Sequence, residues 1–289
     1  MPAIMPNESQ PGDFAQRNHR KQSAINAYPQ LWRRMIRDWQ SDQQEDALWM
    51  LYAASYLART AGVRWALDPF ALFTRAGGVS TLDYRADLVP LDLILLSHRH
   101  ADHFDPHLLT ELCASPLTWI VPEFMLEMVT TFLPLDADRV IIARVDQPIQ
   151  FKTMTITPFK ALHIRGKSGV PELGYLVEYP GKRWLFPGDT RNYDFSMLPD
   201  FGPLDGVFAH LWLGKGAALD PDPPFLEDFC RFFTAFDAQA TFIAHMYEYG
   251  RDERNMWTME HFRTVQERME KLAPGMAIKP VLTGDKILL

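Results

Sequence analysis

The sequence predicts an α/β protein built as a four-layer αββα sandwich, in which two mixed sheets are flanked by helices. Short apolar strands alternate with helical segments in both halves of the chain, which indicates parallel strands joined by crossover helices. Residues 47–68 read as a hairpin leading into a further strand, so antiparallel strands open the domain. Residues 91–98 (LDLILLSH) form a nearly unbroken apolar run, which is typical of a strand buried on both faces.

The other expected elements follow from the same patterns. Helices are expected at residues 106–113, 122–132, 224–236 and 256–271, and strands at 118–121, within 139–157, at 174–179, 183–187, 206–210 and 241–245, and in the terminal DKILL segment.

The N-terminal residues form a separate region in this prediction. Residues 1–25 are polar and rich in turn formers, which indicates a loose tail. Residues 28–41 place Leu31, Trp32, Met35, Ile36 and Trp39 at helical spacing, which predicts an amphipathic helix that either packs on its own domain or serves as a dimer arm. We therefore expect a tail and helix over residues 1–45 and one further domain over residues 46–289.

The composition excludes several classes of protein. The chain has 289 residues with a net charge of -7, and its Lys and Arg residues are scattered, which argues against nucleic acid as a partner. It has no apolar run long enough for a membrane span, and its N-terminus lacks a secretory signal, so a soluble cytoplasmic protein is expected. Cys113 and Cys230 lie in apolar helical contexts and are expected to be buried thiols.

Three imidazoles and a carboxylate fall within six residues, where the buried strand ends at Ser97. If the backbone stays extended through His98 and His100, their side chains point the same way and can share one metal ion. Asp102 and His103 lie where the chain must turn and can bind a second ion nearby. A solvated polar loop is the alternative interpretation of this segment.

Further candidate ligands lie at the ends of other expected strands. They are His163 in KALHIRG, Asp189 in LFPGDTRN and His245 in FIAHMYEYG. Singly, His163 would be a structural histidine and Asp189 the cap of a turn. Together with the cluster at residues 98–103, they favour one shared metal site.

This pattern resembles that of the metallo-β-lactamase superfamily, whose motif is His-x-His-x-Asp-His with later His, Asp and His ligands. All seven positions are present in order, and the resemblance covers roughly residues 47–289. The lactonase-like and phospholipase-like branch usually carries Gly-His-Ala in its opening strand, where this chain has Tyr52-Ala53-Ala54. This departure removes no ligand but weakens the transfer of a substrate from those relatives.

The resemblance implies two divalent ions, with Zn²⁺ preferred and Mn²⁺ or Fe as alternatives. It places His98, His100 and His163 on the first ion and Asp102, His103 and His245 on the second, and Asp189 bridges the two. Asp102 and Asp189 are also the expected catalytic residues. A metal-bridging hydroxide would be the nucleophile, and the chain accordingly has no Gly-x-Ser-x-Gly elbow.

Residues outside the ligand set are assigned from their positions beside it. Asp68, before Pro69, resembles an acid that orients the ligand loop, with a strand-ending Asx turn as the alternative. His210, Lys215 and Tyr247 are candidates for contact with substrate. Arg165, Lys167 and Tyr193 are further candidates for an anionic group.

The sequence therefore predicts a dinuclear metal-dependent hydrolase that cleaves a small ester, lactone or phosphodiester bond in a small-molecule substrate, with a homo-oligomer left open. The alternatives are a mononuclear iron dioxygenase or a nuclease of the same fold. The dioxygenase would leave His103 and His245 without a role, and the nuclease lacks a basic track.

Overall fold

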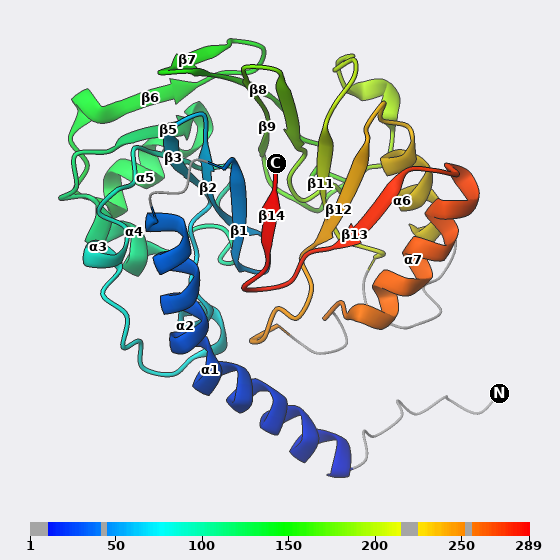
Figure 1. Cartoon of the computed structure of the whole chain (residues 1–289), viewed down its shortest axis with the longest axis horizontal. Helices are drawn as coiled ribbons and strands as arrows, with labels where there is room; N and C mark the ends of the chain where they lie inside the picture. Colours follow the sequence, from blue (N-terminus) through cyan, green and yellow to red (C-terminus); the bar gives the residue numbers. More distant parts are fainter. Residues whose placement is uncertain (1–10, 42–44, 215–224, 252–255) are drawn as a thin grey trace.

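Two seven-stranded sheets form the centre of the computed structural model, which describes residues 11–41, 45–214, 225–251 and 256–289 (Figure 1). The first sheet has the order β14-β1-β2-β3-β4-β5-β6, and the second has the order β13-β12-β11-β10-β9-β8-β7. The strands of the first sheet are β1 (Ala47–Tyr52), β2 (Ser55–Thr60), β3 (Val63–Leu67), β4 (Leu93–Leu95), β5 (Thr118–Pro122), β6 (Val140–Ala143) and β14 (Lys286–Leu288). Those of the second are β7 (Ile149–Phe151), β8 (Met154–Lys160), β9 (Leu173–Tyr179), β10 (Lys182–Phe186), β11 (Gly206–His210), β12 (Ala240–Ala244) and β13 (Ala277–Pro280).

Both sheets are mixed. In the first, β14, β1, β2 and β3 pair antiparallel, whereas β3, β4, β5 and β6 pair parallel. In the second, β7, β8, β9 and β10 pair antiparallel, whereas β10, β11, β12 and β13 pair parallel. The expected opening hairpin is present, because Ala61 and Gly62 both have positive φ and turn the chain from β2 into β3.

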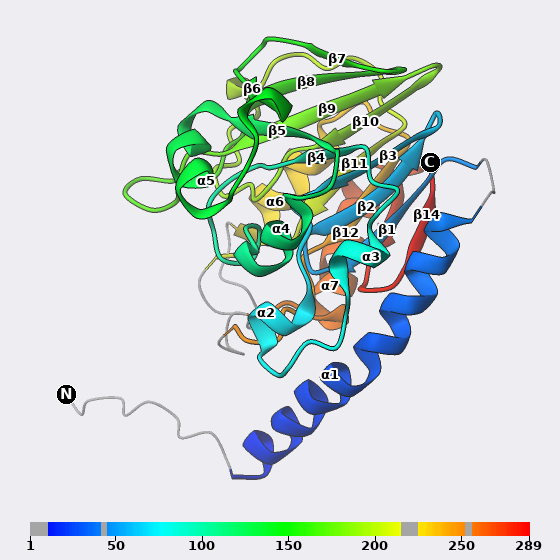
Figure 2. The same cartoon turned by 90° about the vertical axis from the view of Figure 1, so that its left-hand side faces the viewer.

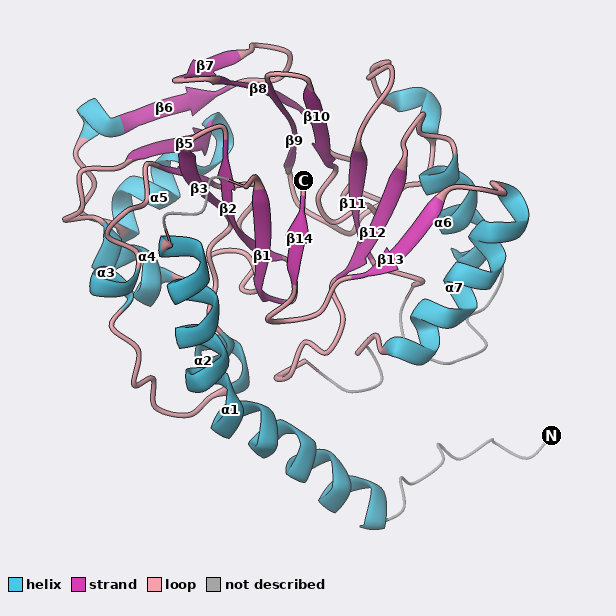
Figure 3. Ribbon diagram, in the orientation of Figure 1, coloured by secondary structure: helices cyan, strands magenta, loops and turns pink. Residues whose placement is uncertain are grey.

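Helices cover both outer faces of this pair of sheets (Figure 3). The helices on the first sheet are α1 (Pro11–Gln40), α2 (Leu72–Ala76), α3 (Tyr84–Asp87), α4 (Pro106–Leu112) and α5 (Leu126–Phe132), and those on the second are α6 (Phe225–Thr234) and α7 (Met259–Leu272). Three 3₁₀ turns complete the described elements: η1 (Glu123–Met125), η2 (Ala137–Arg139) and η3 (Phe195–Met197). The predicted four-layer αββα sandwich is confirmed. Helices α2 and α3 were not predicted, because four or five residues are too few to show a helical period.

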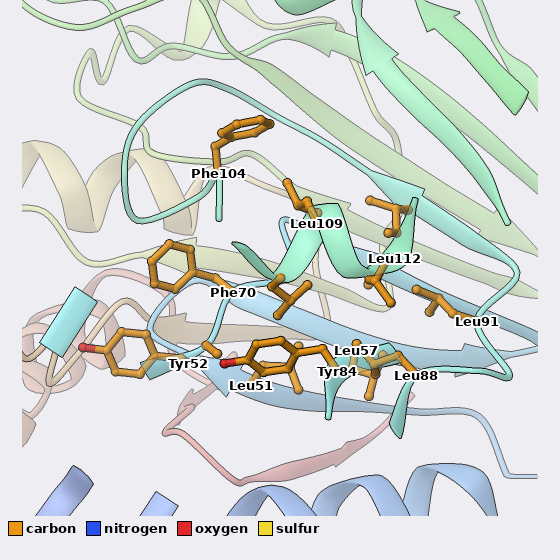
Figure 4. Close-up of a cluster of buried hydrophobic side chains, with 14 of the residues drawn as sticks. Leu51, Tyr52, Leu57, Phe70, Tyr84, Leu88, Leu91, Phe104, Leu109 and Leu112 are labelled. Carbon is orange, nitrogen blue, oxygen red and sulfur yellow. The ribbon is translucent and has the colours of Figure 1, made fainter. Parts of the chain in front are cut away.

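The core has three apolar clusters, one at each contact between layers. Leu48 and Met50 of β1 face the other sheet, whereas Trp49 and Leu51 face the helices. This alternation explains why β1 is apolar on both faces. Leu109 and Leu112 of α4 share the helix-side cluster with Leu57 of β2 (Figure 4).

Helix α1 is longer than the sequence predicted. It begins at Pro11 rather than at residue 28, so the expected loose tail is wrong for residues 11–25. The polar segment contains Ala, Gln, Arg and Lys, which are good helix formers but show no apolar period. The period begins where the helix reaches the first sheet, at buried Tyr28 and Trp32. The end near Pro11 lies away from the sheets (Figure 2).

Two further expectations concern the cysteines and membrane-spanning helices. Cys113 and Cys230 are both buried and free, as predicted. Among the described helices, none combines the length and apolarity that a bilayer span requires.

A buried arginine binds backbone carbonyls at the end of α1 and just before β1. Arg59 of β2 is 4% exposed, and its Nη1 donates to the carbonyls of Trp39 (3.0 Å) and Ser41 (2.9 Å). Its Nε donates to the Glu45 carbonyl at 3.3 Å. One side chain therefore holds the carbonyls at the end of the helix and at the start of the sheet.

We expect Arg59→Met to destabilise the fold strongly. Methionine keeps much of the apolar stem but leaves three carbonyls without this donor, which should lower the free energy of unfolding by about 2–4 kcal/mol and Tm by roughly 5–10 °C. Thermal and urea unfolding measure this loss. Exposed Arg85 provides the control. A change for Arg59→Met as small as that of Arg85→Met would contradict this role.

Candidate metal centre

Candidate ligands and their supports follow strands of both sheets at one edge of the sandwich. Asp68 follows β3, the loop with His98, His100, Asp102 and His103 follows β4, His163 follows β8, Asp189 follows β10, His210 ends β11 and His245 follows β12. The structure thus brings segments far apart in sequence to one place.

A tight turn shapes the loop after β4. The backbone N–H groups of His103 and Phe104 both donate to the His100 carbonyl, at 3.0 and 2.9 Å. The side chain of Asp105 then accepts from Leu108 N and caps α4. This turn lets His98 and His100 face one position and Asp102 and His103 another.

Three groups of possible metal ligands result within the part of the chain that the structure describes; Asp68, His98 and His103 form the smallest, and the two groups of four residues share Asp189. The first group of four is His98, His100, His163 and Asp189, and the second is Asp102, His103, Asp189 and His245. In each group, one ligand atom from every residue lies within 4.8 Å of the others. All seven residues expected from the sequence are therefore brought together.

The imidazole nitrogens at this position are suited to metal ions. Nε2 of His98, His103, His163 and His245 is buried and has no hydrogen-bond partner in the described part of the chain. A buried polar atom left unpaired costs about 1–3 kcal/mol. Four such atoms gathered beside ionised carboxylates form the donor set that divalent cations bind, so the residues fit the implied metals.

Charge favours ionised carboxylates, and burial favours a neutral His100 imidazole. Burial opposes ionisation of Asp102 and Asp189, but neighbouring histidines outweigh it and hold the pKa of both carboxyls well below the usual range. Burial lowers the pKa of His100 to about 4, assisted by His98 and His163. The His100 imidazole is thus neutral at physiological pH, which leaves its lone pair available to a metal.

The pKa values of the His163 and His103 imidazoles shift in opposite directions. Burial lowers the pKa of His163. Burial also opposes the charged form of His103, but Asp189 and Asp68 outweigh it and raise the pKa of His103 well above its usual value.

Two carboxylates hold the rings of His98 and His103 in place. Asp68 accepts from the backbone N of Ser97 (2.7 Å) and from its hydroxyl, and it pairs with Nδ1 of His103 at 2.7 Å. Glu172 lies 3.0 Å from Nδ1 of His98, and both its oxygens accept from Asp189 N at 3.1 Å. With their Nδ1 atoms engaged, these imidazoles present Nε2 to the site.

Glycine is required beside Glu172. Gly188 has φ of +74°, and a Cβ added there would overlap the Glu172 carboxylate. The Gly-Asp step therefore lets the chain pass close enough for Asp189 N to reach Glu172.

His210 supports Asp189 from the interior. It is buried, its Nδ1 lies 2.9 Å from Asp189 Oδ1, and its Nε2 lies 2.9 Å from the hydroxyl of Tyr56. Both ring nitrogens are thus engaged. The geometry corrects the expectation of substrate contact and favours a role in holding Asp189.

The other substrate candidates are placed differently. Lys215 lies outside the described residues. The Tyr247 hydroxyl accepts from Met259 N at the start of α7, at 3.2 Å. Arg165 lies over the ring of Phe225, Lys167 is exposed, and Tyr193 donates to the Trp212 carbonyl. None of these described residues lines the cavity beside the candidate ligands.

Sequence reasoning missed several charged residues. Glu172 and Glu248 are both buried, and Arg251 donates from Nη2 to Asp102 Oδ2 at 2.8 Å. Glu172 opens the apolar segment of β9, which is the one local signal for it, because a carboxyl buried there needs partners. Arg251 and Glu248 pair with each other, but their other partners, Asp102 and Arg75, come from distant segments that spacing does not reveal.

Comparisons with known proteins agree with this architecture. A family model described as "Beta-lactamase superfamily domain" matches residues 68–246. A search of curated protein sequences found no match.

Solved structures share the fold at low sequence identity. A metallo hydrolase from the archaeon Ignicoccus hospitalis aligns with a TM-score of 0.61 and 16% identity over 84% of this chain and 98% of that one. An isothiocyanate hydrolase from Delia radicum gut bacteria aligns with a TM-score of 0.59 and 17% identity over 84% and 99%. A diiron β-hydroxylase from Streptomyces venezuelae aligns with a TM-score of 0.60 and 17% identity over 86% of this chain and 55% of that one.

Proposed function

The chain belongs to the β-lactamase superfamily, and on this premise we propose that it is a dinuclear metal-dependent hydrolase of a small ester, lactone or phosphodiester. One observation carries the proposal: two groups of four possible ligands share Asp189. A carboxylate shared by two ligand groups suits a pair of adjacent ions. The superfamily consists mostly of metal-dependent hydrolases, and structural neighbours include one described as a metallo hydrolase.

Each polar side chain around the site has a role in this mechanism. Two divalent cations would act as Lewis acids on the scissile bond and lower the pKa of water towards neutrality. Asp68 and Glu172 orient His103 and His98, so that their Nε2 lone pairs face the site. Asp189 is positioned by Glu172 through its backbone and by His210 through its side chain.

The donor set favours Zn²⁺, with Mn²⁺ or Fe as alternatives. It contains imidazoles and carboxylates but no thiolate, because neither cysteine belongs to the ligand groups. Imidazole suits zinc and iron, whereas carboxylate also suits manganese.

Metal analysis of the purified protein tests the proposal. We expect about two zinc or manganese ions per chain, loss of turnover after chelation, and recovery when either ion is restored. Bis(para-nitrophenyl) phosphate and a simple lactone serve as substrates. One iron per chain, or no turnover of either substrate with any ion, would contradict it. The iron outcome would favour the mononuclear iron dioxygenase.

A further inference from the structure

A cavity of about 560 Å³ opens beside the candidate ligands His100 and Asp102. Its volume is in the usual range of small-molecule sites. Beyond the ligand loop, three arginines and two tryptophans line it: Arg75, Arg191, Arg251, Trp212 and Trp257. The wall beside the reacting position is therefore cationic and aromatic.

Two of the three guanidinium groups are already paired with carboxylates. Nε of Arg75 lies 2.9 Å from Glu248 Oε1, and Nε of Arg251 lies 2.6 Å from Glu248 Oε2. Arg251 also donates to Asp102 at 2.8 Å. Through these contacts the two arginines link α2 and the segment around Glu248 to the loop that carries Asp102. Glu248 and Asp102 largely compensate their charge.

Arg191 is different, because its guanidinium has no hydrogen-bond partner among the described residues. Its Nε is buried and unpaired, and its closest carboxylate oxygen is Asp189 Oδ2, 4.0 Å from Nη2. The guanidinium lies 5.7 Å from the ring centre of Trp212, and the Arg191 backbone N donates to the Leu162 carbonyl beside His163. The cation is thus held at the cavity by one long ion pair with Asp189 and by no hydrogen bond to a described residue.

The same cavity wall contains a second unpaired donor. The indole Nε1 of Trp257 is buried and has no hydrogen-bond partner within the described ranges. This indole nitrogen and Arg191 Nε are closed to the cavity, whereas the Arg191 side chain as a whole is 20% exposed, so a ligand can reach the rest of its guanidinium. A reachable cation on this wall suits a ligand with negatively charged oxygens.

We propose that Arg191 binds a carboxylate or phosphate group of the substrate, and that the enzyme acts on small organic anions with an apolar part against Trp212 and Trp257. This proposal rests on the hydrolase function above, because the bound anion places the scissile bond next to the ligand loop. A guanidinium is suited to the task, because its planar donors match both kinds of oxyanion.

Calorimetric binding of ligands that cannot be hydrolysed tests the site without requiring turnover. Benzoate and phenylphosphonate are compared with neutral benzamide on the metal-loaded protein. Arg191→Met should weaken the binding of one or both anions by about tenfold to a hundredfold. The binding of benzamide and the metal content should not change. The anion whose affinity falls more shows whether the site prefers a carboxylate or a phosphate group. Arg144→Met is the control, because Arg144 pairs with Glu123 elsewhere on the surface. Anion binding that is undetectable, or unaffected by the substitution, would overturn the proposal.

Turnover of a matched pair of esters separates this inference from the hydrolase function. Mono-para-nitrophenyl succinate carries a free carboxylate, and para-nitrophenyl valerate is neutral. Arg191→Met should reduce kcat/KM for the succinate by tenfold or more and leave the valerate within about threefold. An equal loss for both esters would show that Arg191 is only structural. If neither ester is cleaved but anion binding still depends on Arg191, the hydrolase function fails and the anion site stands.

Discussion

Asp189→Ala should lose metal and turnover together. Asp189 is the residue shared by both ligand groups, so its removal affects both ions at once. It also removes the partner of His210 Nδ1. Substitution of residues behind the ligands typically costs tenfold to a hundredfold in metal affinity or activity, so we expect a loss beyond about a hundredfold in kcat for a shared ligand.

Metal content by mass spectrometry and kcat on the substrates above measure this result. Asp200→Ala is a matched control, because Asp200 is exposed and, among the described residues, its side chain accepts only from Gly202 N in a turn. Asp189→Asn keeps the shape but removes the charge, and it should fall between the parent and Asp189→Ala. An Asp189→Ala protein that retains two ions and kcat within threefold of the parent would disprove the shared-ligand role.

Glu172→Ala should weaken metal binding without removing a ligand. The Glu172 carboxylate pairs with His98 Nδ1 and accepts from Asp189 N, so one side chain positions residues of both ligand groups. Burial raises the pKa of Glu172, but the charge of His98 outweighs it, so the pKa is lowered and the carboxylate stays ionised. We expect the metal dissociation constant to rise by about tenfold to a hundredfold for Glu172→Ala, and by less for Glu172→Gln.

Competition with a chromophoric chelator measures this constant. Glu178→Gln in β9 is the control, because Glu178 pairs with Arg183 at 2.8 Å, away from the ligand groups. Thermal unfolding of the metal-free proteins separates lost stability from lost metal affinity. If Glu172→Gln and Glu178→Gln bind metal equally well, the orienting role of Glu172 is refuted.

The residue types that metal chemistry needs were recognisable in the sequence. Imidazoles and carboxylates at the ends of apolar strands stand out, because such strands must end at the sheet edge, where a shared site forms. The sandwich was predictable for a similar reason, since strand and helix periods are local properties of the chain. The structure brings the seven residues together, and their binding of metal is the proposal tested above.

The supporting groups were decided by tertiary structure. Tyr56 and His210 are 154 positions apart, and Arg251 and Asp102 are 149 apart. No local pattern encodes such pairs, because a buried polar atom is satisfied by whatever segment the fold packs against it. For the same reason, His210 looked like a loop residue facing substrate, whereas the packing of β2 against β11 turns it inward to Tyr56.

The length of α1 illustrates the same division. The sequence by itself determined the apolar stripe on the part of the helix that meets the sheet, because that stripe is the residue pattern that burial demands. The polar part from Pro11 onward has helix propensity but no partner to impose a period, so only the folded chain shows where the helix begins. Burial imposes a residue pattern that can be recognised in the sequence, whereas the tertiary structure decides which distant polar groups become partners.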